Sequence, residues 1–265
     1  MLHTLVEEPK AVILDIGGFT ADYLLMKNGE IDLTSCDSLE NGVILLYNKV
    51  RSKVNSELDL LLDEGDVDAD MLSRTRIFHF GSLSFTHKRC RKATRKAIKA
   101  AKSKHRLISF DPNYRPVLWP GEEEARKWML YGCSVCDILK VEASELAFIT
   151  QQTTIQNGVD FLQKHYSISL ILVTSGEAGS QAFMGNRKVY QEAFLTNRTI
   201  DTTGAGDTFC ACLLHDVLEH GINDRKDDDV KKMLTFANAA ASLITTRKGA
   251  LRVMPEKGEV EAVIK

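Results

Sequence analysis

The segment Asp201–Asp207 (DTTGAGD) has the residue types and spacing needed to hold a phosphate and to activate a hydroxyl group. Its two glycines, Gly204 and Gly206, allow the backbone to approach a phosphate closely, and an apolar helix is expected to begin beside them. The start of a helix presents unpaired N–H groups with positive dipole character, which favour bound anions. Gly204, Ala205 and Gly206 therefore form a candidate anion hole for charge that develops on a transferred γ-phosphoryl group.

Asp207 lies in the first turn of the expected helix, beside this anion hole. A carboxylate at that place can accept the proton of an attacking alcohol, as phosphoryl transfer to a hydroxyl requires. The plain alternative is a tight Gly-Ala-Gly loop in which Asp207 only caps the helix. The loop taken alone does not decide between these two interpretations.

The elements that would position this loop alternate between strands and helices. Beyond about residue 70, short apolar runs typical of strands are separated by longer stretches with helical periodicity. This alternation predicts an α/β fold with a mostly parallel sheet and helices on both faces. The expected strands are Arg76–Phe80, Leu107–Phe110, Asp137–Val141, Leu170–Thr174, Ser180–Met184 and Lys188–Phe194, and the expected helices are Thr86–Lys104, Glu122–Tyr131, Thr154–His165, Gly204–His220 and Asp227–Thr246.

The first 70 residues follow a different pattern. Three strands and one helix are expected there, at Ala11–Ile16, Tyr23–Met26, Ile31–Thr34 and Ser38–Leu58. Asn28-Gly29 between two strand-like runs is a strong hairpin signal. An acidic stretch, Asp59–Asp70, is the candidate seam, so we expect two parts, residues 1–68 and 69–265.

The composition excludes several classes of partner. The chain has 265 residues, 44% of them hydrophobic and 26% charged, and a formal net charge of −2, which is typical of a globular protein without a nucleic-acid or membrane partner. No apolar run approaches the roughly 20 residues of a membrane span, so we expect a cytoplasmic protein. The basic face of the expected helix Thr86–Lys104 is interpreted as a solvated surface, because no aromatic residues interleave with the charges. A homodimer remains open.

The longer string Asp201–Phe209 (DTTGAGDTF) resembles the second signature of the ribokinase/PfkB family of carbohydrate kinases. The resemblance covers about residues 70–255 and implies a ribokinase-like α/β fold that binds ATP and Mg²⁺ and phosphorylates a sugar hydroxyl. The stretch Asp111–Pro116 (DPNYRP) is similar to the fructokinase-type branch, as are Phe78–Ser82 and Trp119. In that branch the corresponding Asn and Arg lie at the sugar site, which implicates Asn113 and Arg115 in substrate binding.

The same resemblance implies roles for further residues. Glu142–Glu145 falls on the family's N-x-x-E motif, with Glu142 in place of the Asn, so that only Glu145 is expected to organise Mg²⁺ and phosphate, and indirectly. Thr174, Gly176, Asn238 and Gly249 match segments along the nucleotide, and Asp201 and Thr203 fall where many members bind a monovalent cation such as K⁺. Asn238 could instead be an ordinary polar helix residue, and Gly249 is also a good helix C-cap.

Residues about 11–62 show a second likeness. Val12–Asp22, with the pattern D-I-G-G-x-T-x-D, resembles the phosphate-binding hairpin of actin-like ATPases, most closely the plasmid-segregation (ParM-type) actins. In that fold the Asp and the Gly-Gly turn contact nucleotide phosphates and a metal-bound water. A plain glycine-containing β-hairpin is the alternative.

These features predict an ATP-dependent, fructokinase-like sugar kinase. The first strands, the lid and a sugar-binding Gly-Gly…Asn motif of the resembled family find no counterpart in the sequence, so weak or absent activity is one expectation. A non-catalytic nucleotide-binding fusion protein and an actin-like nucleotide-binding protein are the alternatives.

Overall fold

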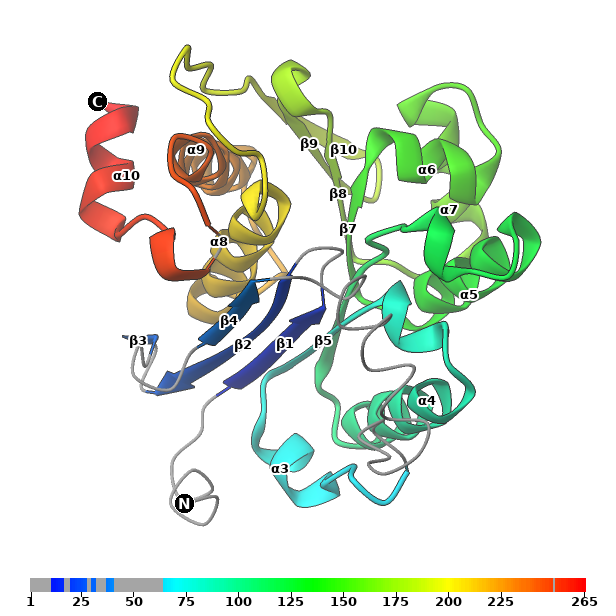
Figure 1. Ribbon diagram of the computed structural model, residues 1–265. Coiled ribbons are helices and arrows are strands. Elements are labelled where there is room, and N and C mark those ends of the chain that lie inside the picture. The colour runs from blue at the N-terminus through cyan, green and yellow to red at the C-terminus, as the bar shows by residue number, and fades with distance from the viewer. Residues whose placement is uncertain (1–10, 17–19, 28–29, 32–36, 41–63, 250) are drawn as a thin grey trace. The chain divides into compact units, whose positions relative to one another are not determined.

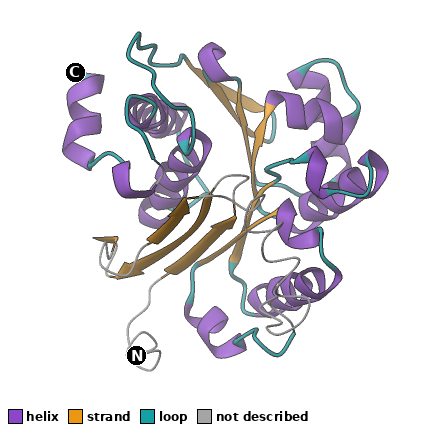
Figure 2. Cartoon of the chain, in the orientation of Figure 1, coloured by secondary structure: helices purple, strands orange, loops and turns teal. Residues whose placement is uncertain are grey.

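The computed structural model describes residues 11–16, 20–27, 30–31, 37–40, 64–249 and 251–265 (Figure 1). The chain divides into two compact units, Met1–Cys136 and Asp137–Lys265. The boundary expected between residues 68 and 69 lies inside the first unit and remains a prediction. Figure 2 shows that helices and strands alternate along most of the described chain, as an α/β fold requires. Strands β5 and β6 pair within the first unit, and strands β7 to β10 form a sheet within the second.

The first unit holds two parallel strands and the helices beside them. Its elements from residue 69 onward are α3 (Ala69–Arg74), β5 (Ile77–Gly81), η1 (Ser82–Phe85), α4 (Lys88–Ser103), β6 (Leu107–Asp111), η2 (Pro116–Leu118) and α5 (Glu122–Val135). The parallel register pairs Phe80 with Phe110, and their rings stack with centroids 4.8 Å apart. Helix α4 buries one apolar stripe, namely Ala93, Ala97, Ile98 and Ala101. Burial of this stripe agrees with the interpretation of the basic side as the outer face.

The N-terminal strands of this unit form a separate sheet. It consists of β1 (Ala11–Ile16), β2 (Thr20–Lys27), β3 (Glu30–Ile31) and β4 (Asp37–Glu40), with β2 antiparallel to each of the other three. The strands expected at Ala11–Ile16 and Tyr23–Met26 are thereby confirmed. The helix expected over Ser38–Leu58 is wrong at its start, because residues 37–40 pair with β2 as a strand; residues 41–58 lie outside the described residues. Strand β1 lies beside β5 in Figure 1.

The second unit carries a sheet between two layers of helices. Its elements are β7 (Ile138–Glu142), α6 (Ala143–Thr150), α7 (Ile155–His165), β8 (Leu170–Thr174), η3 (Gly176–Ala178), β9 (Ser180–Met184), β10 (Arg187–Gln191), α8 (Ala205–His220), α9 (Asp227–Ile244), η4 (Leu251–Val253) and α10 (Lys257–Ile264). Helices α6 and α7 cover one face of β7 to β10, and α8 and α9 cover the other (Figure 1).

The sheet of the second unit contains both parallel and antiparallel pairs. Strands β7 and β8 are parallel, whereas β9 and β10 form the expected hairpin and run antiparallel to their neighbours. Strand β8 is buried from Leu170 to Val173, as expected for a strand covered on both faces. Among the helices of the described part of the chain, none is both long and apolar enough to cross a membrane.

Candidate active site

The loop before α8 has the backbone geometry of an anion-binding site. Gly204 is the N-cap of α8 and adopts a left-handed conformation with φ 81° and ψ −3°. A side chain at such a φ is strained, so the glycine is required for the turn. The N–H of Thr208 donates to the carbonyl of Gly204 at 2.8 Å, the first helical bond of α8. The N–H groups of the preceding turn, including those of Gly206 and Asp207, therefore belong to the helix end that attracts anions. Asp207 is half-buried in this first turn.

Asp201 ties the start of this loop to the end of α9. Its carboxylate accepts the N–H of Thr203 at 2.9 Å, and its own N–H donates to the carbonyl of Thr245 at 3.1 Å. Hydrogen bonds from Thr203, first from its backbone and then from its side chain, lower the pKa of Asp201, and a bond from the Gly249 N–H and the charge of Lys248 add to this effect. Asp201 thus connects the segment Asp201–Asp207, which is expected to hold phosphate and is called the phosphate loop below, with the turn around Gly249.

Glu145 is buried at the junction between β7 and α6. Its side chain is 8% exposed, and its carboxylate accepts the backbone N–H of Glu142 at 3.0 Å. The side chain of Glu142 caps the same helix in return, so the two glutamates form a capping box. Because Glu142 performs this local task, its replacement of the family's Asn is compatible with a well-formed helix start. Glu142 also pairs in register with Thr174, so the carboxyl ends of β7 and β8 lie side by side.

The turn after β8 is open on one side and tightly packed on the other. Gly176 has φ 54°, and a Cβ built there would meet nothing within 4 Å. Gly179 also has a positive φ, and a side chain there would overlap the carbonyl oxygen of Gln191. The amide of Asn238, on α9, donates to the carbonyls of Gln191 and Glu192 at 3.3 and 3.1 Å. Asn238 therefore holds the segment against which the turn packs.

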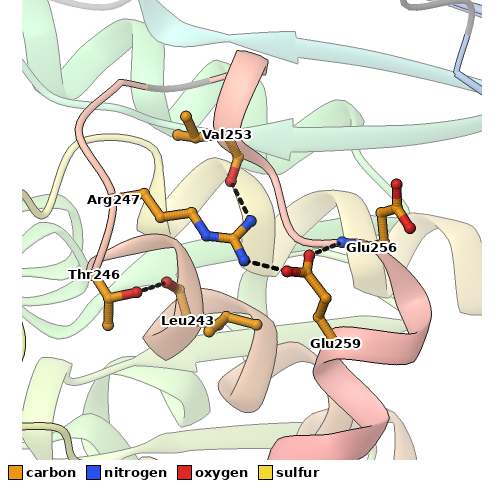
Figure 3. Close-up of polar contacts among 6 residues, drawn as sticks. All are labelled: Leu243, Thr246, Arg247, Val253, Glu256 and Glu259. Atoms are coloured by element: carbon orange, nitrogen blue, oxygen red, sulfur yellow. Dashed lines mark hydrogen bonds and ion pairs between the residues drawn. The ribbon is translucent and has the colours of Figure 1, made fainter.

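A network of polar contacts holds the segment that follows Gly249 (Figure 3). Gly249 has φ 118°, a backbone conformation suited to glycine. The guanidinium of Arg247 donates to the carbonyl of Val253 at 3.2 Å and forms an ion pair with Glu259 on α10. Glu259 also accepts the N–H of Glu256 at 2.8 Å, closing the capping box of α10. The hydrogen bond from Arg247 is the main cause of the lowered pKa of Glu259.

In the first unit, Asn113 and Arg115 lie together in the loop after β6. Arg115 donates to the side-chain oxygen of Asn113 at 3.2 Å and to the carbonyl of Tyr114 at 3.1 Å. Asn113 has φ 48°, which asparagine tolerates better than most residues. Asp111 and Trp119, at either end of the loop, are 2% and 7% exposed. The structure thus brings together the two residues expected at the sugar site.

Lys140, which lies near the loop before α8, was not among the site residues expected from the sequence. It lies on β7 with only 7% of its surface exposed, and its ammonium is close to Gly206. The available signal was a lysine inside an otherwise apolar strand, since Lys is almost never fully buried without a partner.

A model of the pfkB family of carbohydrate kinases matches residues 46–257. The chain belongs to this family. The match begins within residues 11–62, and the actin-like resemblance of that segment gains no support. The family agrees with the α/β fold and with the glycine turn that leads into α8.

Plant fructokinases are among the similar proteins. The chain is 35% identical over 211 residues to "Probable fructokinase-2" of Arabidopsis thaliana, which covers 80% of this chain and 64% of that protein. It is 36% identical over 210 residues to fructokinase-2 of Oryza sativa subsp. japonica, covering 79% of this chain and 62% of that protein. The chain therefore spans less than two thirds of the length of these relatives.

A solved bacterial structure has the same fold. The fructokinase of Vibrio cholerae O395, crystallised with fructose, ADP and calcium ion, superposes with a TM-score of 0.65 and 27% identity over 71% of this chain and 60% of that one. A double mutant of that enzyme was crystallised with fructose, ADP and potassium ion. These similarities show a ribokinase-like α/β fold.

Proposed function

We propose that this protein is an ATP-dependent sugar kinase that transfers the γ-phosphate of ATP to a hydroxyl of a ketohexose such as fructose. The observation that carries the proposal is the left-handed turn at Gly204, which begins α8 and sets Asp207 in its first turn. Family membership and the similarity to fructokinases support the choice of acceptor.

Each group of residues has a role in this reaction. The first-turn N–H groups, from Gly204 to Gly206, stabilise charge on the phosphoryl group as it moves. Asp207 accepts the proton of the attacking hydroxyl. Asn113 and Arg115 bind sugar oxygens, for which a planar guanidinium is a suitable donor. Thr174, Gly176, Asn238 and Gly249 line or support the nucleotide site; of these, Asn238 acts through the backbone of Gln191 and Glu192.

Two cation sites are part of the proposal. The carboxylate of Asp201 is ionised at neutral pH, as an aspartate with an ordinary or lowered pKa is, and this charge suits a monovalent cation such as K⁺ held together with Thr203. Glu145 would help to hold Mg²⁺ indirectly, and its buried carboxylate is positioned by the N–H of Glu142. When bound, Mg²⁺ neutralises charge on the phosphates.

A coupled assay of ADP release, run with ATP and Mg²⁺ across a panel of sugars, tests this function. We expect sugar-dependent turnover that is fastest with a ketohexose. Calorimetry in parallel measures ATP binding with and without sugar, and sedimentation of the same sample tests for a homodimer. Folded protein that binds ATP but shows no sugar-dependent turnover would refute the kinase and identify a non-catalytic nucleotide-binding protein.

A further inference from the structure

Lys140 is a buried cation in the middle of strand β7. Its neighbours in the strand, Ile138, Leu139 and Val141, are at most 1% exposed, and Lys140 itself is 7% exposed. Taking an ammonium group out of water costs several kcal/mol unless charges or hydrogen bonds compensate for it. A hydrophobic residue would fill this place at lower cost, so the charge is expected to serve a purpose.

The Lys140 ammonium lies against the first turn of α8. A Cβ built on Gly206 would be 3.2 Å from the Nζ of Lys140 and 4.0 Å from its Cε. The charged end of Lys140, on strand β7, therefore lies near the backbone of Gly206, a residue of helix α8 that has no side chain. The next residue along the helix is Asp207, the proposed base.

Lys140 lies on the same face of β7 as Glu142, the residue at the carboxyl end of the strand. Side chains alternate along a strand, so Lys140 and Glu142 share one face and Leu139 and Val141 share the other. Lys140 pairs with Leu172, and Glu142 with Thr174, in the parallel ladder between β7 and β8. In open α/β sheets ligands bind beyond these carboxyl ends, next to helix N-termini.

We propose that Lys140 is a further catalytic residue, whose ammonium contacts the oxygens of the terminal phosphates of ATP. This inference rests on the proposed kinase function and adds a full positive charge to the partial charges of the α8 N–H groups. In the step, the γ-phosphorus bonds to the sugar oxygen and its bond to the β-phosphate oxygen breaks, leaving ADP. The hydroxyl proton goes to Asp207, and Lys140 keeps its proton throughout.

The test uses the full chain with Lys140→Met, which keeps the length of the side chain and removes its charge. Lys164→Met on α7, an exposed lysine of the same unit, is the matched control for net charge. Calorimetry measures the affinity for a non-hydrolysable ATP analogue, ADP and adenosine. We expect Lys140→Met to weaken binding of the ATP analogue at least tenfold and binding of adenosine less than twofold. We also expect it to lower kcat by about 10²–10³-fold, as the loss of one transition-state donor does. The control should behave as wild type.

Lys140→Arg retains the charge and should recover part of the affinity for the ATP analogue. Such recovery is not expected if Lys140 contributes only to packing. If the Met variant does not fold, the Cε chemical shift of Lys140 in labelled wild type is measured instead. It should move with the ATP analogue and stay constant with adenosine.

The proposed role of Lys140 would be overturned if Lys140→Met weakened the binding of the ATP analogue and of adenosine equally, or weakened neither. It would also be overturned if the Cε chemical shift of Lys140 did not change when the ATP analogue binds. If the wild type binds ATP but shows no sugar-dependent turnover, the proposed kinase function is refuted. The role of Lys140 in phosphate binding would still be decided by whether Lys140→Met loses affinity for the ATP analogue but not for adenosine.

Discussion

The loop before α8 and the loop after β6 both carry expected site residues, but they are built in different ways. In the first, the positive φ falls on a glycine, Gly204, and the binding groups are backbone N–H groups at a helix end. In the second, the positive φ falls on Asn113, and the side chains of Asn113 and Arg115 contact each other. The proposed phosphate site is thus defined by local backbone geometry, whereas the proposed sugar site depends on side chains and on the buried residues that hold them.

The largest effect is expected at the phosphate loop, from Asp207→Asn. The amide keeps the shape of the side chain but cannot accept the proton, and a general base contributes about 10²–10⁴-fold to the rate. We expect kcat to fall by that factor while ATP affinity, measured by calorimetry, stays nearly constant. A variant that retains most of its turnover would remove Asp207 from the mechanism.

In the sugar loop, Arg115→Lys is expected to act on substrate binding rather than on chemistry. Lysine keeps the charge but loses the planar fork of donors, and hydrogen bonds to charged groups contribute about 1.5–3 kcal/mol, or roughly tenfold or more in affinity. The KM for the sugar should rise by that factor, with kcat and the KM for ATP within about threefold of wild type. Arg74→Lys, on the exposed end of α3, is the control. An unchanged sugar KM would mean that Arg115 does not touch the sugar.

Gly204→Ala tests whether the phosphate loop is specified by its backbone. Alanine at φ 81° is strained by about 1–2 kcal/mol, so the melting temperature should fall by several degrees. The same substitution at Gly258 in α10, where a Cβ would meet nothing within 4 Å, should raise stability by up to about 1 kcal/mol because alanine favours helix. If Gly204→Ala melts at or above the wild-type temperature, the left-handed turn is not required.

A smaller effect is expected from Asp201, and it depends on pH. Its pKa is lowered in the folded protein, so the ionised form stabilises the fold; this contribution is present above the ordinary pKa near 3.8 and is lost as pH falls through the lowered value. Asp201→Asn should therefore be slightly less stable than wild type at neutral pH, because solvent screens much of the interaction of this exposed carboxylate. The difference should be constant from pH 7 to pH 5 and shrink below pH 4 in thermal melts. A gap that stays constant down to pH 2 would contradict this assignment.

The smallest effect is expected from Asp15→Ala in strand β1. If the N-terminal strands contribute burial rather than catalysis, ATP turnover and ATP affinity should both equal those of wild type. Deletion of residues 1–63 should instead yield aggregated protein, because β5, which lies beside β1, would become an exposed edge. A loss of ATP affinity in Asp15→Ala would support the actin-like hypothesis. A soluble truncated chain with an unchanged melting temperature would show that the N-terminal strands are independent of the rest.

Much of the architecture follows from the sequence alone. The strands β5 to β10 and the helices α4, α5, α7, α8 and α9 all match expected segments, because their apolar residues repeat with a period set by the backbone. The helix start after Gly204 was also predictable, since a glycine turn and a first-turn carboxylate are local features. Helix α6 was missed because only eight residues, Ala143–Thr150, form it, and its apolar side chains follow directly from those of β7.

Other features were decided only by the tertiary structure. Residues 38–40 were expected to begin a helix and instead belong to strand β4, because β2 pairs with them. The approach of the Lys140 ammonium to Gly206, and the hydrogen bonds from Ile200 and Asp201 to Thr245, bring together residues more than forty positions apart. Periodicity and turn chemistry describe a residue's near neighbours in the chain, whereas the groups proposed to surround a phosphate come from separate strands and helices. Their meeting depends on how those elements pack, which no local pattern in the sequence records.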